Sequence, residues 1–216
     1  MQPRGPWPVM QLRFGTNLTS EQYVSQESWR NATLERCPLH GEKRCGFRAH
    51  GTYGRKGPSG VRIARFYCRK GRTTFSLLPD FAAARLSETL AEVEETVELV
   101  ESASSLTAVA LALRPELNDA RSAVRWVRRR VQGVERALLA MVTLLPELFG
   151  IAPRLAAVRL RLGIESDLLV RLRAVGASKL HALQIPLGFC QRSRSGAVIG
   201  TQPQHKVGPD PASHCR

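Results

Sequence analysis

The chain has 216 residues, enough for one ordinary domain or for two small domains with a tail. Its hydrophobic fraction of 43% is typical of globular proteins, and its net charge of +14 favours a polyanionic partner, most simply nucleic acid. Five unevenly spaced cysteines argue against a disulfide framework, and no segment has the roughly 18 to 20 consecutive apolar residues that a bilayer requires. We therefore expect a cytoplasmic protein without a membrane partner.

The charge is unevenly distributed along the chain. Residues 1–80 hold fourteen Lys/Arg and five Asp/Glu, a net charge of +9, whereas residues 81–113 hold one and six, a net charge of −5. Residues 114–180 return to thirteen and six, a net charge of +7. This alternation predicts a basic module, an acidic connecting helix and a second basic module.

The first 34 residues predict a loosely structured lead-in. They are Pro-rich at first and polar afterwards, with Phe14, Tyr23 and Trp29 as scattered apolar anchors. No apolar run follows the first arginine, so we expect no signal peptide.

Residues 35–80 predict a small β-rich module. One strand contains Tyr53, and a Gly/Pro/Ser/Gly turn separates it from a β-rich run that ends at Cys68. The segment TTFSLLP reads as a closing strand, which Pro79 ends.

A helical period begins near Phe81. Apolar residues three or four apart predict helices over residues 86–101, 105–113 and 119–145, and two further helices near 153–162 and 165–175. Candidate caps and breakers mark their ends: Ser104, Ser105, Pro115, Asn118, Asp119, Pro146 and Gly163. We assign residues 81–180 to this helical domain and residues 181–216, rich in Gly, Pro, Ser and Gln, to a disordered tail.

Four potential metal ligands lie within the β-rich module. Cys37 and His40 are separated by two residues, a gap at which a tight turn presents both to one ion; Cys45 follows closely, and Cys68 ends a predicted strand. A module of this length lacks a sufficient hydrophobic core, so a metal commonly stabilises it. We predict one zinc ion held by these four residues. The alternative is that they are incidental loop residues, with Cys68 a small buried apolar group.

The segments RCPLHGEKRCGFRAHGTYGRK and RIARFYCRKGRTTFSLLPDFAAARL resemble the N-terminal zinc ribbon of insertion-sequence transposases and their uncharacterised transposon-associated bacterial relatives. The resemblance covers about residues 12–85, and TFSLLPD with Cys68 is its most specific part. It implies that Cys37, Cys45 and Cys68 are zinc ligands and that a helix-turn-helix module follows the ribbon.

The sequence departs from this pattern after Cys68. Gly71 and Arg72 stand where the relatives would carry a Cys or His. His40 can take the fourth place, with His50 as the alternative. With the resemblance included, the predicted fold is α+β: a zinc-ribbon-like module, a mainly α-helical, helix-turn-helix-like bundle and a disordered C-terminal tail.

The three predicted helices between residues 86 and 145 have the order and lengths of a helix-turn-helix unit, with the third helix as the reader. A row of guanidinium groups near a helix N-terminus suits phosphate and guanine contacts in a major groove of duplex DNA. The candidate DNA-binding residues are Arg121, Arg125, Arg128, Arg129 and Arg130. The alternative is a solvated arginine face on a core helix.

The third helix also carries an apolar seam at spacings of three and four. It comprises Val124, Val127, Val131, Val134, Leu138, Met141, Leu145 and Leu148. The seam predicts packing into the protein's own core or pairing with a second copy in a homodimer. The acidic helix before it carries five glutamates, which we interpret as a solvated face that can pair with arginines. They are Glu92, Glu94, Glu95, Glu98 and Glu101.

Nothing in the sequence points to catalysis. Transposases cut DNA with three carboxylates on a separate nuclease-like domain, whereas only about seventy residues follow position 145 here. The chain has four aspartates, Asp80, Asp119, Asp167 and Asp210, and no phosphate-binding loop or nucleophile elbow. We therefore predict a DNA-binding, transposon-derived accessory or regulatory protein without a catalytic domain. The alternatives are a helical partner-binding or RNA-binding protein with a structural zinc ribbon, and a fragment of a transposase.

Overall fold

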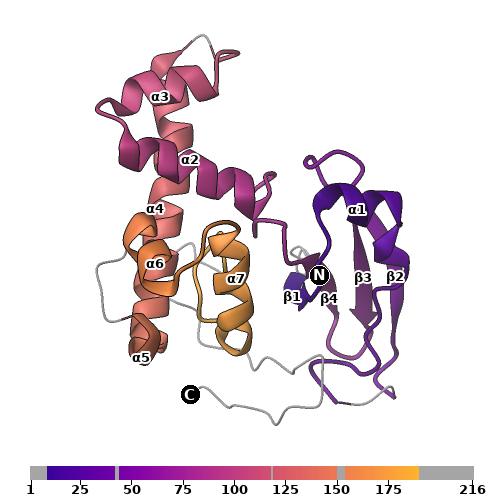
Figure 1. The fold of residues 1–216 in the computed structure, drawn as a ribbon. Helices are drawn as coiled ribbons and strands as arrows, with labels where there is room; N and C mark the ends of the chain where they lie inside the picture. The colour runs from indigo at the N-terminus through magenta and orange to yellow at the C-terminus, as the bar shows by residue number, and fades with distance from the viewer. Residues whose placement is uncertain (1–8, 42–43, 118, 150–153, 190–216) are drawn as a thin grey trace, which may run out of the picture. The chain divides into compact units, whose positions relative to one another are not determined.

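The computed structural model of the chain describes residues 9–41, 44–117, 119–149 and 154–189 (Figure 1). It contains a four-stranded mixed sheet and a set of helices, so the predicted α+β class is confirmed. The chain folds as two compact units, and within the described residues the division falls between Ala82 and Ala83. This is two residues beyond the boundary that the sequence suggested.

The first unit is built on a sheet of strand order β1-β4-β3-β2. β1 runs parallel to β4, whereas β2, β3 and β4 pair antiparallel in succession. Its elements are β1 (Val9–Phe14), α1 (Ser20–Ser25), the 3₁₀ turn η1 (Ser28–Arg30), β2 (Phe47–Gly54), β3 (Arg62–Cys68) and β4 (Thr73–Pro79). The three strands predicted after residue 35 are therefore confirmed.

The loosely structured lead-in predicted for residues 1–34 is wrong for residues 9–30, which belong to the sheet unit. β1 pairs with β4, and Leu12, which is 3% exposed, lies opposite Leu77 and in the same core cluster as Phe75. A parallel strand needs a partner far along the chain. Because β4 lies about sixty residues downstream, the local pattern of residues 9–14 does not reveal the pairing.

Tyr23 fixes α1 to the first unit. Its side chain is fully buried, and its ring packs edge-on against the rings of Phe14 and Phe81. Its hydroxyl donates to the backbone carbonyl of Arg62 at 3.0 Å, and burial raises the pKa of Tyr23 to about 12. The scattered aromatic anchors of the sequence are therefore parts of one core.

The second unit is helical and runs from Ala83 to the last described residue, Phe189. Its elements are α2 (Leu90–Ser102), α3 (Leu106–Leu113), α4 (Ala120–Leu144), α5 (Pro146–Phe149), α6 (Leu155–Leu162), α7 (Leu168–Val175) and the 3₁₀ turn η2 (Ala177–Lys179). The predicted helices are confirmed, and two of the predicted caps function: Ser105 accepts from the N–H of Ala108, and Asp119 accepts from that of Ser122. Pro146 follows the end of α4 closely, as expected.

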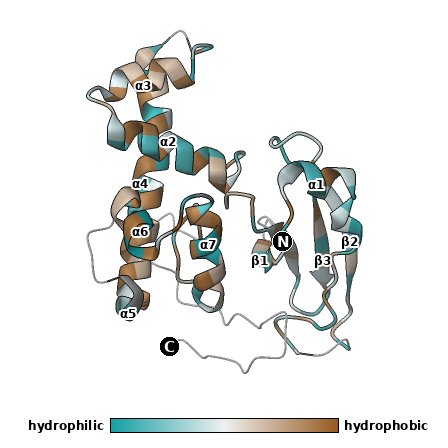
Figure 2. Ribbon diagram, viewed as in Figure 1, coloured by the Kyte–Doolittle hydropathy of each residue, from teal (hydrophilic) through white to brown (hydrophobic). Residues whose placement is uncertain are grey.

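The apolar seam of α4 packs within the chain. Val127, Val134, Leu138 and Met141 are all at most 1% exposed. Figure 2 shows both hydrophobic and hydrophilic residues along α4. The chain's own residues therefore cover these four residues of the seam, whereas Val124, Val131 and Leu145 are half-buried.

The disordered tail predicted from residue 181 is wrong for residues 181–189. Leu183 and Leu187 are fully buried in the helical unit. The fully buried side chain of Arg173 donates to the backbone carbonyls of Pro186 and Leu187 at 2.7 and 2.9 Å. The remainder of the predicted tail, residues 190–216, lies outside the described residues.

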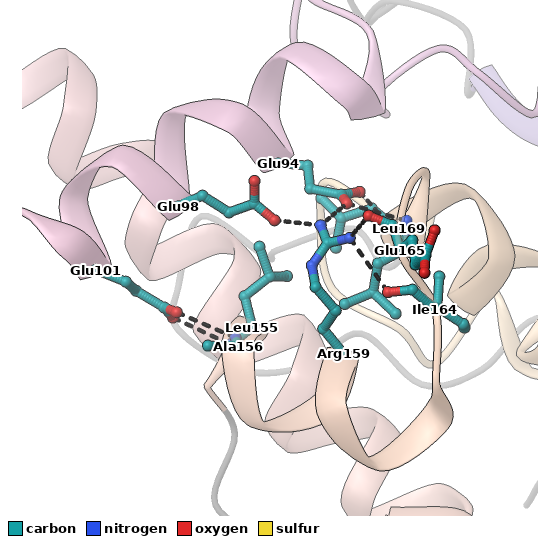
Figure 3. A network of polar contacts seen from close by, with 10 residues as sticks. Glu94, Glu98, Glu101, Leu155, Ala156, Arg159, Ile164, Glu165 and Leu169 are labelled. Atoms are coloured by element: carbon teal, nitrogen blue, oxygen red, sulfur yellow. Dashed lines mark hydrogen bonds and ion pairs between the residues drawn. The ribbon is translucent and has the colours of Figure 1, made fainter.

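The acidic face of α2 supports two other helices instead of facing only solvent (Figure 3). Neither α6 nor α7 has a side-chain cap from its own N-cap residue. The carboxylate of Glu101 accepts the N–H groups of Leu155 and Ala156 at the start of α6, at 3.0 and 3.1 Å. A carboxylate at a helix N-terminus satisfies free N–H groups and interacts favourably with the helix dipole.

Glu94 caps α7 in the same way and is 4% exposed. It accepts the N–H groups of Leu168 and Leu169 at 3.1 and 2.9 Å. Arg159 of α6 forms ion pairs with both Glu94 and Glu98, so part of the expected pairing with arginine is present (Figure 3). Three of the five glutamates therefore hold the helical unit together.

Candidate functional site

The first unit brings the four predicted metal ligands together. Cys37 and His40 lie in the loop after η1, Cys45 lies just before β2, and Cys68 ends β3. One ligand atom from each residue falls within a group whose members all lie within 4.8 Å of one another. The three thiols are at most 4% exposed and His40 is half-buried, so the group can hold a metal ion.

The distances within the group suit a small ion. The Nδ1 atom of His40 lies 3.4 Å from the Sγ atoms of both Cys37 and Cys68. Tetrahedral zinc, with bonds of about 2.0 to 2.3 Å, places its ligand atoms roughly 3.3 to 3.8 Å apart. Three thiols and one imidazole are also a common donor set of structural zinc sites.

Two tight turns present the ligands. In the first, the N–H groups of His40 and Gly41 donate to the carbonyl of Cys37 at 3.3 and 2.8 Å. In the second, the N–H of Gly71 donates to the Sγ of Cys68 at 3.2 Å. A hydrogen bond to sulfur orients the ligand and favours the thiolate that a metal requires.

Gly71 lies where a side chain has little room. A Cβ atom at this position would lie 2.6 Å from Cδ1 of Leu39 and 3.4 Å from the Sγ of Cys68. Gly71, one of the two positions at which the resemblance implied a further ligand, is therefore closely packed, and the first turn offers a fourth donor through His40. His50, the alternative ligand, is exposed on β2 beside the ring of Tyr67 and is not part of the group.

Burial opposes ionisation of the Cys37 thiol. Desolvation raises the pKa of Cys37 to about 12, although the N–H groups of Leu39 and His40 act in the opposite direction. A thiolate in such surroundings needs a nearby cation to be stable, because burial without a counter-charge favours the neutral form. The chemistry of the group therefore fits a metal centre better than a set of reactive cysteines.

The second candidate site is the basic face of α4. Four of the predicted residues, Arg121, Arg125, Arg128 and Arg129, are exposed and line one groove. Thr107 of α3 and Gln132 also line it. Within the part of the chain that the structure describes, none of these four guanidinium groups forms an ion pair.

Arg130 is not part of this groove, so its assignment as a DNA contact is wrong. It is 7% exposed, forms an ion pair with Glu88, and lies 3.8 Å above the ring of Trp126. The sequence could have predicted this burial. Arg130 follows Val127 by three residues and precedes Val134 by four, so it lies on the same side of the helix as the buried seam. Its positive charge is therefore used within the fold.

Comparisons with protein-family models, curated proteins and solved structures gave no match to this chain. The resemblance to the transposase zinc ribbon thus remains a prediction from the motifs. Among the described helices, none combines the length and the apolar character needed to cross a membrane.

Proposed function

We propose that this protein binds duplex DNA through the arginine groove of α4 and that a single zinc ion stabilises its first unit. The groove is the observation that carries the DNA-binding role, because four exposed guanidinium groups share one surface and none of them forms an ion pair within the described residues. Clustered, unpaired guanidinium groups displace counterions from phosphates, and this displacement drives non-specific DNA binding.

The zinc assignment follows from the donor set. Three buried thiols and one imidazole are softer than the oxygen ligands that magnesium or calcium prefers. The ion supplies crosslinking between the loop after η1, the segment before β2 and the end of β3. With all four protein ligands engaged, no position is left open for substrate or water, which is typical of a structural zinc site.

The wider biological role rests on the resemblance. A zinc ribbon followed by a DNA-binding helical unit fits a transposon-derived accessory or regulatory protein of the cytoplasm. The helix-turn-helix description of α2, α3 and α4 belongs to the same proposal. We propose no catalytic activity for this chain.

The test is the salt dependence of duplex binding. For B-DNA the slope of log affinity against log salt concentration is about −0.9 per phosphate contacted, so four arginine contacts give about −3.6. Affinity should then fall roughly 150-fold between 50 and 200 mM salt. The double variant Arg125→Ala/Arg128→Ala should halve the slope and leave the helix content unchanged, because Ala is the better helix former.

A matched control is available in the same unit. Arg161→Ala/Arg171→Ala removes the same charge from exposed positions at α6 and α7, outside the groove. It should leave the slope within about one unit of the parent value. Equal slopes for the parent and both double variants would refute the groove as the DNA contact, and binding to RNA but not to duplex DNA would refute the choice of nucleic acid.

A further inference from the structure

A cavity lies in the first unit, beside the edge of the sheet. Its volume is about 460 Å³, within the range of roughly 300–1,000 Å³ that is usual for small-molecule sites. Residues of η1, β2 and β3 line it, and the metal ligands do not. The cavity is therefore separate from both candidate sites described above.

The sequence creates this space through small residues and a bulge. Ala32, Ala49 and Ala64 line the cavity where larger side chains would fill it. The pairing of β2 with β3 shifts register between Ala49 and Thr52, and Gly51 within the bulge has a positive φ of 73°. Bulges of this kind redirect side chains and are frequent beside functional sites.

The lining joins apolar rings to positive charge. Trp29 and Phe66, each 8% exposed, contribute the aromatic part. Arg30 and Arg62 contribute two guanidinium groups. Among the described residues, Arg30 forms an ion pair with Glu27, which also lines the cavity, whereas Arg62 forms no ion pair and its Nε donates to the Oγ1 of Thr52 at 3.0 Å. The side chain of Arg65 points to the other face of the sheet, where its guanidinium group lies 5.5 Å from the ring centroid of Tyr53.

We propose that this cavity binds one nucleotide unit, with its base against the aromatic lining and its phosphate at Arg62. A phosphate alone would leave the apolar lining unused, and a neutral apolar ligand would leave the guanidinium group of Arg62 without an anion. A nucleotide satisfies both requirements, since every base has an apolar ring face and each nucleotide carries a phosphate. The source is either a free mononucleotide or one residue of a single-stranded nucleic acid.

Calorimetric titration of the full-length, zinc-supplemented protein tests this proposal. The probes are adenosine monophosphate, adenosine, ribose 5-phosphate and a single-stranded oligodeoxyadenylate. Adenosine monophosphate should bind at least about tenfold more tightly than either of its parts, because base and phosphate contribute together. Similar binding of the mononucleotide and the oligonucleotide indicates a free nucleotide as the ligand, whereas at least tenfold tighter binding of the oligonucleotide indicates a strand.

Three variants locate the binding. Ala49→Leu fills the cavity from an exposed position of β2, and Arg62→Gln removes one cation; each should weaken binding by about tenfold. Arg48→Gln is the matched control for Arg62→Gln. Arg48 is an exposed arginine of β2 and does not line the cavity. It should change affinity by less than about twofold. Circular dichroism and zinc content report whether each variant is folded.

The proposal is overturned if the parent binds neither the mononucleotide nor the oligonucleotide at about 10 mM, or if Ala49→Leu and Arg62→Gln, folded and zinc-loaded, bind as the parent does. The double variant Arg125→Ala/Arg128→Ala separates this site from the α4 groove. It should lose duplex binding and keep mononucleotide binding, so either function can fail without the other.

Discussion

Replacing Glu94 with Gln should destabilise the helical unit strongly, although it changes one oxygen to an amide nitrogen. Glu94 is buried, accepts two N–H groups at the start of α7, and forms an ion pair with Arg159. The amide keeps one acceptor, so one N–H of α7 faces a donor. Of its two carboxylate partners Arg159 then retains the half-buried Glu98, besides the backbone carbonyls of Ile164 and Glu165. Loss of a cap costs about 1 kcal/mol, and an unpaired buried group costs about 1–3 kcal/mol.

The expected loss of unfolding free energy is therefore about 2–4 kcal/mol. For a unit of roughly a hundred residues this lowers the midpoint of thermal unfolding by roughly 10–20 °C. Urea and thermal unfolding followed by circular dichroism measure both quantities.

Glu95→Gln is the matched control for this prediction. Glu95 is the next residue of α2, is exposed, and should change stability by no more than about 0.5 kcal/mol when neutralised. The reasoning is refuted if the two variants unfold alike. Zinc content should be the same in both, since the metal ligands belong to the other unit.

Two further predictions concern the same unit. Gly188→Ala would place a Cβ atom 2.1 Å from the carbonyl oxygen of Leu183. The substitution should therefore destabilise the unit by about 3 kcal/mol and expose residues 181–189 to proteases. If the variant kept the parent's stability and protease resistance, this segment would not pack as described. Burial opposes the charge of Glu88, but the hydrogen bond and charge of Arg130 prevail and hold its pKa below the ordinary value. The pair should therefore stabilise the fold above about pH 4.5 and lose this contribution as pH falls through the lowered pKa, an effect of under about 1 kcal/mol that Arg130→Met should abolish in unfolding curves measured across pH.

The elements that the sequence predicted well are those with a strong local pattern. The strand ending at Cys68 and the helix from Ala120 to Leu144 carry their apolar period, caps and breakers within their own residues. The metal group was predictable as well, because the spacing of Cys37 and His40 is a property of one tight turn.

The elements that the sequence did not predict depend on distant partners. β1 is a strand because β4 pairs with it, and residues 181–189 are ordered because the buried Arg173 binds their carbonyls. Glu94 and Glu101 cap helices more than fifty residues away, so local capping patterns did not reveal them. No periodicity signals the cavity beside Trp29 either, because it arises from small residues on separate elements.

The arginines of α4 include both a correct and an incorrect prediction from the sequence. Helical spacing placed Arg121, Arg125, Arg128 and Arg129 on one surface, and they do line one groove. Inclusion of Arg130 followed from adjacency in the sequence, whereas its phase with Val127 puts it on the buried side of the helix.

Metal analysis of the purified protein tests the central claim most directly. Protein made with zinc available should carry about one zinc per chain, since Cys37, His40, Cys45 and Cys68 form a complete set of four donors. Cys68→Ser should lose the zinc and unfold the first unit, whereas Cys215→Ser should retain both the metal and the fold. Absence of stoichiometric metal from the parent, or full zinc retention by Cys68→Ser, would contradict the account.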